Sequence, residues 1–289
     1  MSDSRPDLDF KLSITRALAD QLAEALRRCV PTVLTVDALT HLQDRPGVYQ
    51  LLINDELVYI GKASRSLPSR LAAHARKLSG RQGFEDREVR FVCLYVDEDL
   101  EASAPETLLI KRHRTHSAAL WNTNGFGNND PGRRRDTSRV AVNHFDALHP
   151  INLDVVVDLL PGPMTAAEAL PMLKAALPYL LRFEDPRRND SAASDYTNAS
   201  LMIPDARMPA RDAIAIVLKA LPPRWQATAL PGYIILYPEN GTEYDSAMFY
   251  WRSFGGGVTF AEGPRRLGAA EVPNADKDDG IEKGSEEAL

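Results

Sequence analysis

The sequence predicts an α+β protein in which a small antiparallel sheet flanked by helices is followed by a second α+β region. Three observations lead to this prediction. Two apolar segments, 47–53 and 56–60, surround a short polar turn, a pattern typical of a β-hairpin. Amphipathic helical patterns alternate with further apolar segments along the chain. The 289 residues, 44% of them apolar, can fill more than one core.

The first half predicts one compact unit. Residues 9–30 carry Leu and Ile at helical spacing and predict an amphipathic helix that flanks the sheet. After the hairpin we expect a helix over 67–78, a strand over 89–96 and a helix over 104–116. Residues 121–139 are dense in Asn, Gly and Pro and predict a loop. The order is therefore β-β-α-β-α.

The second half predicts a separate α+β region that starts near Asn152. Its expected elements are, in order, an apolar strand "LDVVVDLL", a helix over 165–182, a polar stretch over 184–200, a helix over 208–221 and two aromatic-rich strands, "GYIILYP" and "AMFYWRSF". We expect the two aromatic strands to pair antiparallel over a core covered by the helices. The acidic residues 263–289 are expected to be disordered.

Composition excludes several classes of protein. No segment is apolar enough to cross a membrane, and the acidic start "MSDSRPDLDFK" does not resemble a secretory signal, so we expect a soluble cytoplasmic protein. Cys29 and Cys93 have no CxxC spacing, which argues against a disulfide framework or a thiolate zinc site. We expect both to be core thiols.

Charge is spread unevenly, although the net charge is −6. Residues 1–150 hold 21 Lys/Arg against 20 Asp/Glu, whereas residues 151–289 hold 13 against 20. Bases gather further over 60–90, with eight against three acids, and over 111–139, with seven against two. Such local basic stretches can bind phosphates even on an acidic protein. The alternative is that they form solvated surfaces.

The hairpin carries two tyrosines, Tyr49 and Tyr59, that share a face only if an odd number of residues closes the turn. We expect a three-residue turn over 54–56. One side of the hairpin would then be lined by Tyr49, Leu51, Ile53, Leu57 and Tyr59. Gly61 beside them allows close approach of a ligand or backbone. The alternative is a pair of β-favouring tyrosines packed in a core.

The helix after the hairpin, "LPSRLAAHARKL", places Arg70 and His74 four residues apart, and so on one face. An Arg guanidinium suits a phosphate or oxyanion, and a His can shuttle a proton near neutral pH. The alternative is an ordinary polar pair on a helix surface.

Glu106 also has two interpretations. In "SAPE" it fits a capping box with Ser103. A carboxylate in a first helical turn can instead bind Mg²⁺, which takes one or two protein carboxylates together with waters and substrate phosphate.

Taken in order, GVY, YIGKA, R-x-x-x-H and E-x-x-L-I-K leading into LWN resemble the GIY-YIG nuclease superfamily. The run "GFGNNDPG" after LWN further resembles the type II restriction endonucleases of that superfamily. The resemblance covers roughly residues 45–150. Two departures are GVY in place of GIY and the apparent insertion of residues 115–119 before LWN.

The resemblance implies roles in phosphodiester hydrolysis for the residues that match the motifs. Tyr49 would be the general base, with its phenol pKa of about 10 lowered by cations such as Lys62 or by the metal-bound phosphate. Tyr59 and His74 would position the water or relay its proton. Arg70 would stabilise the non-bridging oxygens.

The resemblance further implies that Glu106 binds one Mg²⁺, or Mn²⁺, on the side of the leaving group. Asn122 matches the final asparagine of the family, and Asn124 is the alternative because of the insertion at 115–119.

The function implied is a Mg²⁺-dependent DNA endonuclease of restriction or phage-defence type that acts on double-stranded DNA. A homodimer is expected, because two-fold symmetry suits cleavage of both strands of a palindrome. One alternative is a structure-selective repair nuclease, against which the lack of an evident helix-hairpin-helix appendage argues. The other is a catalytically silent protein of the same fold that binds DNA or a partner.

DNA contacts are expected from two basic groups, one around the helix after the hairpin and one in "GRRRDTSR". The residues concerned are Lys62, Arg76, Lys77, Arg133, Arg134 and Arg135. The domains expected are a helical flank at 1–44, the GIY-YIG nuclease domain at 45–150, an α+β accessory domain at 151–262 and the tail at 263–289. We expect the accessory domain to serve dimerisation, a regulatory partner or sensing of DNA.

Overall fold

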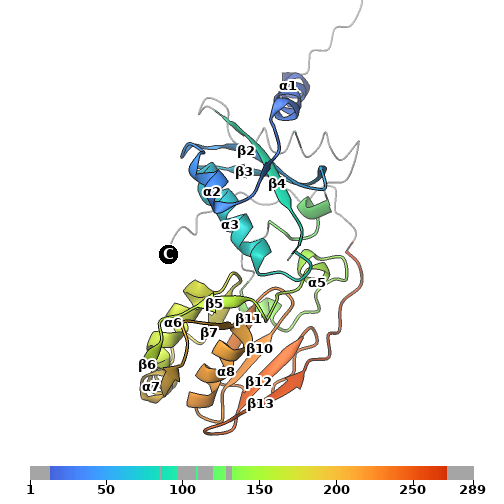
Figure 1. Cartoon of the computed structure of the whole chain (residues 1–289). Coiled ribbons are helices and arrows are strands. Elements are labelled where there is room, and N and C mark those ends of the chain that lie inside the picture. The colour runs from blue at the N-terminus through green and yellow to red at the C-terminus, as the bar shows by residue number, and fades with distance from the viewer. Residues whose placement is uncertain (1–13, 85, 97–108, 110–119, 128–131, 272–289) are drawn as a thin grey trace, which may run out of the picture. The chain divides into compact units, whose positions relative to one another are not determined.

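The computed structural model describes residues 14–84, 86–96, 109, 120–127 and 132–271 (Figure 1). The chain divides into two compact units, Met1–Asn122 and Thr123–Leu289. The helix predicted over 104–116 lies outside the described residues except for Leu109, and so does the tail beyond residue 271. Within the described ranges, no helix combines the length and apolar character needed to span a bilayer.

The N-terminal unit is built on a four-stranded antiparallel sheet in the order β1-β4-β2-β3 (Figure 1). Its strands are β1 (Thr32–Val33), β2 (Gly47–Ile53), β3 (Glu56–Ala63) and β4 (Val89–Tyr95), and its helices are α1 (Ile14–Arg28), α2 (Val36–Thr40), α3 (Leu67–Ser79) and the short 3₁₀ turn η1 (Leu120–Asn122). The predicted hairpin, the helix after it and the strand over 89–96 are confirmed. Strand β3 runs three residues beyond its predicted end at residue 60.

Both faces of this sheet are covered. On one face, Ala23 and Leu26 of α1 pack with Val48, Ile60 and Val92 of the central strands. The opposite face belongs to α3, which contacts β2 and β3. Leu67, Leu71, His74 and Leu78 form the buried stripe of that helix. Ser66 caps its first turn by accepting from the Ser69 N–H, and Pro68 follows within that turn. The helix is thereby fixed directly after the hairpin.

Tyr49 and Tyr59 share one face of the hairpin as predicted, but the turn between the strands differs from the predicted one. Its turn has two residues, Asn54 and Asp55, both with positive φ (52° and 63°), as a type I′ turn requires. A two-residue turn alone would put Tyr49 and Tyr59 on opposite faces. A β-bulge restores the parity, because Leu51 pairs with Tyr59 while Leu52 pairs with Leu57. The predicted three-residue turn is therefore wrong. The prediction that Leu57 shares a face with Tyr49 is also wrong, because Leu57 lies on the α1 face with Leu52.

The C-terminal unit is built on a five-stranded sheet in the order β13-β12-β10-β11-β7. Its strands are β7 (Leu181–Phe183), β10 (Gln226–Ala229), β11 (Ile234–Tyr237), β12 (Phe249–Ser253) and β13 (Val258–Glu262), and its helices are α5 (Phe145–Leu148), α6 (Ala166–Ala176), α7 (Asp190–Asn198), α8 (Ala210–Ala220) and the 3₁₀ turn η2 (Arg133–Arg135). Two small sheets pair β5 (Val156–Asp158) with β9 (Arg207–Pro209), and β6 (Gly162–Thr165) with β8 (Ser200–Ile203). Helix α8 packs on one face of the large sheet (Figure 1).

The helix predicted over 165–182 is too long. Helix α6 ends at Ala176 because Pro178 forces Leu177 into an extended conformation (ψ 136°). The chain then forms β7, which pairs parallel with β11. The polar stretch over 184–200 also holds a helix, α7, whose first turn is capped by Asn189.

The two aromatic strands, β11 and β12, do not pair with each other as predicted. Strand β10 lies between them and pairs antiparallel with both. Its sequence, Gln-Ala-Thr-Ala, has weak strand propensity, but all four residues are buried. Burial between two aromatic strands, which the local sequence does not reveal, makes it the centre of the sheet.

We predict that Asp55→Gly raises the free energy of unfolding by about 0.5 kcal/mol, because glycine adopts the positive φ of this turn position with less strain. The gain should exceed the loss of the exposed Asp55–Arg90 ion pair. Urea unfolding measures the difference. Asp44→Gly is the control, since Asp44 has no positive φ and should gain nothing. A less stable Asp55→Gly variant would show that the turn is not of this type.

Candidate active site

Three aromatic side chains meet on the α3 face of the N-terminal sheet. Tyr49 of β2, Tyr59 of β3 and His74 of α3 have ring centroids 5.4–6.1 Å apart. The Tyr49 hydroxyl lies 2.6 Å from His74 Nε2, which is a short hydrogen bond. All three residues are buried, with exposed fractions of 0%, 6% and 5%. The site predicted from the hairpin and the helix thus joins two tyrosines and one imidazole.

Gly61 makes room for this cluster. It pairs with Tyr49 across the hairpin, and a Cβ at this position would overlap both the Tyr49 hydroxyl and the Tyr59 ring. Glycine is therefore required by the packing of the two phenols. Its backbone lies close to the Tyr49 hydroxyl.

His74 is held in its neutral form. Burial, together with the nearby positive charges of Arg70 and Lys77, lowers its pKa from 6.5 to about 3. A neutral imidazole has one ring nitrogen that can accept, so Nε2 is able to receive the hydrogen bond of the Tyr49 hydroxyl. The hydrogen bond therefore joins the phenol, as donor, to the imidazole, as acceptor.

The other predicted cations of this unit fall into two groups. Arg70, Arg76 and Lys77 lie on α3 with His74, and Arg76 is exposed. Lys62 lies on β3 between Gly61 and Ala63, opposite Val48. Alternation along the strand places Lys62 on the α1 face, away from Tyr49. The positive charge beside the tyrosine and histidine therefore comes from α3.

Asn122 is fixed to the edge of the sheet. Its Oδ1 accepts from the Ile60 N–H at 2.9 Å, and its Nδ2 donates to the Ile60 carbonyl at 2.7 Å. The amide continues the ladder beyond β3, the outermost strand on that side. Asn122 thus lies one residue along β3 from Tyr59. Asn124, the alternative, belongs to the C-terminal unit.

Glu106, the predicted metal ligand, lies outside the described residues. Over the described ranges, no group of three or more His, Cys, Asp or Glu side chains is arranged to hold a metal ion.

Comparison with known families matches residues 54–153 to the family model described as the Eco29kI GIY-YIG domain. The chain contains a GIY-YIG domain. This supports a nuclease of that superfamily and confirms the resemblance to its type II restriction endonucleases. No curated protein matches the sequence.

The match covers about a third of the chain. Tyr59, Arg70, His74, Glu106 and Asn122 fall within it, whereas Tyr49 precedes its first residue by five positions. The geometry nevertheless places Tyr49 in the same cluster as Tyr59 and His74.

The GIY-YIG match continues into the C-terminal unit, which begins at Thr123. There Asp136 is almost fully buried and binds Arg182 Nη1 at 2.7 Å and the Tyr233 hydroxyl at 2.7 Å. Burial and the Asp136 carboxylate raise the pKa of Tyr233, so the phenol stays a donor. These bonds attach Asp136 to β7 and to Tyr233, the residue that precedes β11. The assignment of 45–150 as one domain stays a prediction, because the compact units divide at residue 122.

The three arginines predicted to bind DNA lie on η2 beside Asp136. Arg133 pairs with Glu184 at 3.1 Å and covers the Tyr237 ring at 4.1 Å. Arg135 Nη2 contacts His144 Nε2 at 2.8 Å. Arg134 is exposed. Two of the three guanidiniums therefore have partners within the C-terminal unit itself.

No local pattern in the sequence predicts that Asp136, Arg182 and Tyr233 form a group. The one available signal was a single acid after three arginines in "RRRD". Its partners come 46 and 97 residues later, a separation that no local pattern spans.

We predict that the free energy of unfolding falls as the pH is lowered from 6.5 towards 3. Folded His74 stays neutral in this window because its pKa is about 3, whereas the unfolded chain binds a proton below 6.5. The contribution of His74 to the free energy of unfolding is complete above pH 6.5. Below pH 6.5 this contribution is lost at up to about 1.4 kcal/mol per pH unit. Urea unfolding over this range should show a shallower slope for His74→Gln. The control His41→Gln, at an exposed site, should keep the wild-type slope, and an unchanged slope in His74→Gln would contradict a buried neutral ring.

We predict that Asp136→Ala destabilises the protein by about 3–5 kcal/mol, because it leaves the Arg182 charge and the Tyr233 hydroxyl without their buried acceptor. Thermal unfolding measures this loss. Asp245→Ala is the matched control, since it also removes an acid paired with two arginines, Arg139 and Arg266, but at a solvent-accessible site. Its effect should be much smaller. Equal destabilisation by Asp136→Ala and Asp245→Ala would show that the buried bonds of Asp136 do not stabilise the C-terminal unit.

Proposed function

We propose that this protein is a DNA endonuclease of restriction or phage-defence type that hydrolyses phosphodiester bonds with Mg²⁺ or Mn²⁺ and acts in the cytoplasm on double-stranded DNA. The observation that carries the proposal is the 2.6 Å hydrogen bond between Tyr49 and His74, next to Tyr59 in a GIY-YIG domain. A homodimer would supply one such site for each strand.

The hydrogen bond supports a proton transfer in two linked steps. Tyr49 takes a proton from the attacking water while its own phenolic proton moves to His74 Nε2, and the imidazole becomes charged. In the free protein this charge is disfavoured first by burial and then by the positive charges of Arg70 and Lys77, which together lower the pKa of His74. A phosphodiester bound beside Arg70 offsets that repulsion, so the imidazole becomes a stronger base when substrate is present. Activation of the water is thus coupled to binding of DNA.

Arg70 supports the other half of the reaction. It lies one helical turn before His74, and its positive charge acts on the imidazole. A guanidinium in this position can donate to the non-bridging oxygens, on which charge accumulates in the transition state. Tyr59, with its ring 5.4 Å from that of His74, would orient the water.

Glu106 is the proposed metal ligand. A single carboxylate fits the chemistry of Mg²⁺, which completes its shell with waters and substrate oxygens. When bound, the ion would supply positive charge for the departing 3′ oxygen.

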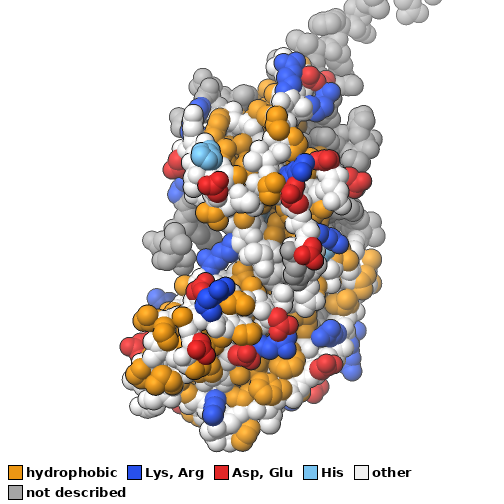
Figure 2. All heavy atoms as spheres, viewed as in Figure 1, with side chains coloured by type: hydrophobic (Ala, Val, Ile, Leu, Met, Phe, Trp, Pro, Cys, Tyr) orange, Lys and Arg blue, Asp and Glu red, His pale blue; other side chains and the backbone are white. Residues whose placement is uncertain are grey.

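DNA contacts are proposed for the exposed side of α3, through Arg76 and Lys77, and for Lys62 and Arg134. Arg133 and Arg135 would have to exchange the partners they have within the C-terminal unit for phosphates. On the face of that unit shown in Figure 2, basic and acidic side chains are interspersed. This mixture favours an accessory role, in dimerisation or in binding a regulatory partner, over a role as the main DNA surface.

Cleavage of supercoiled plasmid by the full chain, with Mg²⁺ and with EDTA, tests the proposal. Tyr49→Phe and His74→Ala should each lower the cleavage rate by about 10²–10⁴-fold while DNA binding persists. Matched controls are Tyr95→Phe and His41→Ala, which change the same residue types outside the cluster.

Full cleavage by Tyr49→Phe would favour the alternative in which the two tyrosines are only core residues. If the wild-type protein binds DNA but cuts no plasmid with Mg²⁺ or Mn²⁺, it is a catalytically silent binding protein.

A further inference from the structure

Strand β13 forms an open edge of the C-terminal sheet. It is the outermost strand on its side among the described residues and pairs only with β12 in the sheet order. Bonds from Phe254 N to Gly257 O and from Gly263 N to Met248 O mark the hydrogen-bonded pairs of the β12–β13 ladder. Because these pairs alternate in an antiparallel ladder, residues 258, 260 and 262 direct their N–H and C=O groups away from β12.

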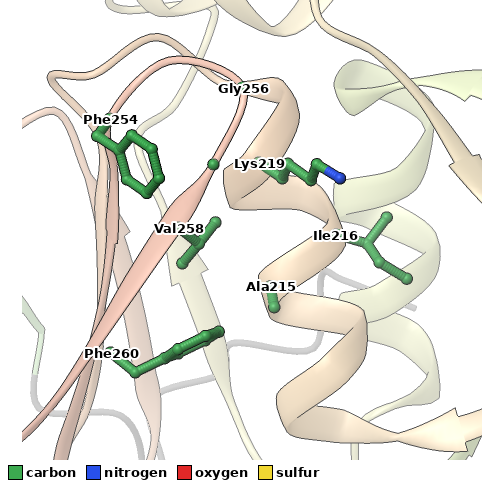
Figure 3. A pocket seen from close by; sticks show the side chains of 8 residues that line it. Ala215, Ile216, Lys219, Phe254, Gly256, Val258 and Phe260 are labelled. Atoms are coloured by element: carbon green, nitrogen blue, oxygen red, sulfur yellow. The ribbon is translucent and has the colours of Figure 1, made fainter.

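The same three residues carry side chains on the face that α8 covers. Phe260 pairs with Trp251, which is buried in the core, and its ring lies 6.1 Å from that of Phe249. Between β13 and α8 runs an open hollow of about 410 Å³ (Figure 3). It is lined by Ala215, Ile216, Lys219, Phe254, Val258 and Phe260. Phe254 and Phe260 remain 59% and 58% exposed, which is unusual for two phenylalanines beside one groove.

We propose that this edge is a homodimer interface in which β13 pairs antiparallel with β13 of a second copy of the chain. In this pairing the two-fold axis passes next to Phe260. Phe260 then lies opposite the partner's Phe260, and Val258 lies opposite the partner's Glu262. All of these residues direct their backbone groups outward, so the pairing closes with main-chain hydrogen bonds on every alternate residue. The two hollows then join, and the two Phe260 rings fill them.

The arrangement of charges favours a second copy of the chain as the partner that binds the β13 edge. Lys219 lines the hollow from α8 beside Gly256, and its ammonium extends away from the strand of Val258 (Figure 3). The two-fold register brings the partner's Glu262 opposite Val258, on the α8 face and so towards Lys219. The symmetry repeats this pair at the other end of the strand. An apolar centre with one cation and one anion placed symmetrically about it is complementary to itself.

The inference rests on the C-terminal unit alone and does not depend on the nuclease activity. Its consequence for that activity is that each assembly carries two GIY-YIG domains.

Sedimentation equilibrium of the full chain, over concentrations up to about 100 µM, tests the interface. The wild-type protein should be a dimer. Phe260→Pro should weaken the dimer at least about tenfold, because proline removes an N–H that points outward and leaves the bonds to β12 in place. Phe260→Val is the matched variant, since it keeps the N–H, and it should remain dimeric. Circular dichroism and thermal unfolding check that both variants stay folded.

A charge exchange provides the second measurement. Lys219→Glu and Glu262→Lys should each weaken the dimer by about tenfold, because like charges meet at both ends of the paired strands. The double variant should restore it. Asp205→Lys, at an exposed site between β8 and β9, is the control and should have no effect. The proposal is overturned if the wild-type protein is monomeric throughout, or if its dimer is unchanged by Phe260→Pro and by both charge reversals.

Discussion

The β-bulge in the β2–β3 hairpin is the constraint on which the site depends. A side chain on a strand points to the face that its register dictates, and one residue more or less reverses that face. The type I′ turn fixes one parity, and the bulge between Leu51 and Leu52 changes it for the remainder of the hairpin. Tyr49, Tyr59 and Gly61 therefore face α3 together. Without the bulge, one phenol would lie under α1 and could not meet His74.

Burial on the α3 face gives this cluster its chemistry. The imidazole loses water and lies near Arg70 and Lys77, so it is neutral and able to accept the tyrosine proton. Burial is the larger cause of the lowered pKa of His74, and the positive charges of Arg70 and Lys77 add to it. In the proposed reaction, a bound phosphodiester would offset the charges of Arg70 and Lys77.

Hydrogen bonds and ion pairs within the C-terminal unit hold residues 132–139, which lie in the last part of the segment that matches the GIY-YIG family model. Asp136 binds Arg182 of β7 and Tyr233, which precedes β11, while Arg133 and Arg135 bind Glu184 and His144. A basic run that looks free in the sequence is thereby tied to its own sheet. The open edge of that same sheet, at β13, is where we place the contact between two copies. The C-terminal unit thus uses the end of its sheet near β7 to bind Asp136 of the same chain, and its β13 edge is the proposed contact with a second copy.

The sequence by itself determined the hairpin, the helix after it, the i,i+4 pair of Arg70 and His74 and the family of the domain, because each depends on residues close together in the chain. It also determined that Tyr49 and Tyr59 could meet, although by the wrong turn, since a bulge leaves no local signature. Only the tertiary structure decided that β10 lies between the two aromatic strands, that Pro178 ends α6 before β7, and that Asp136 is a buried anchor. Those features arise from contacts between segments tens of residues apart, where burial outweighs local propensity.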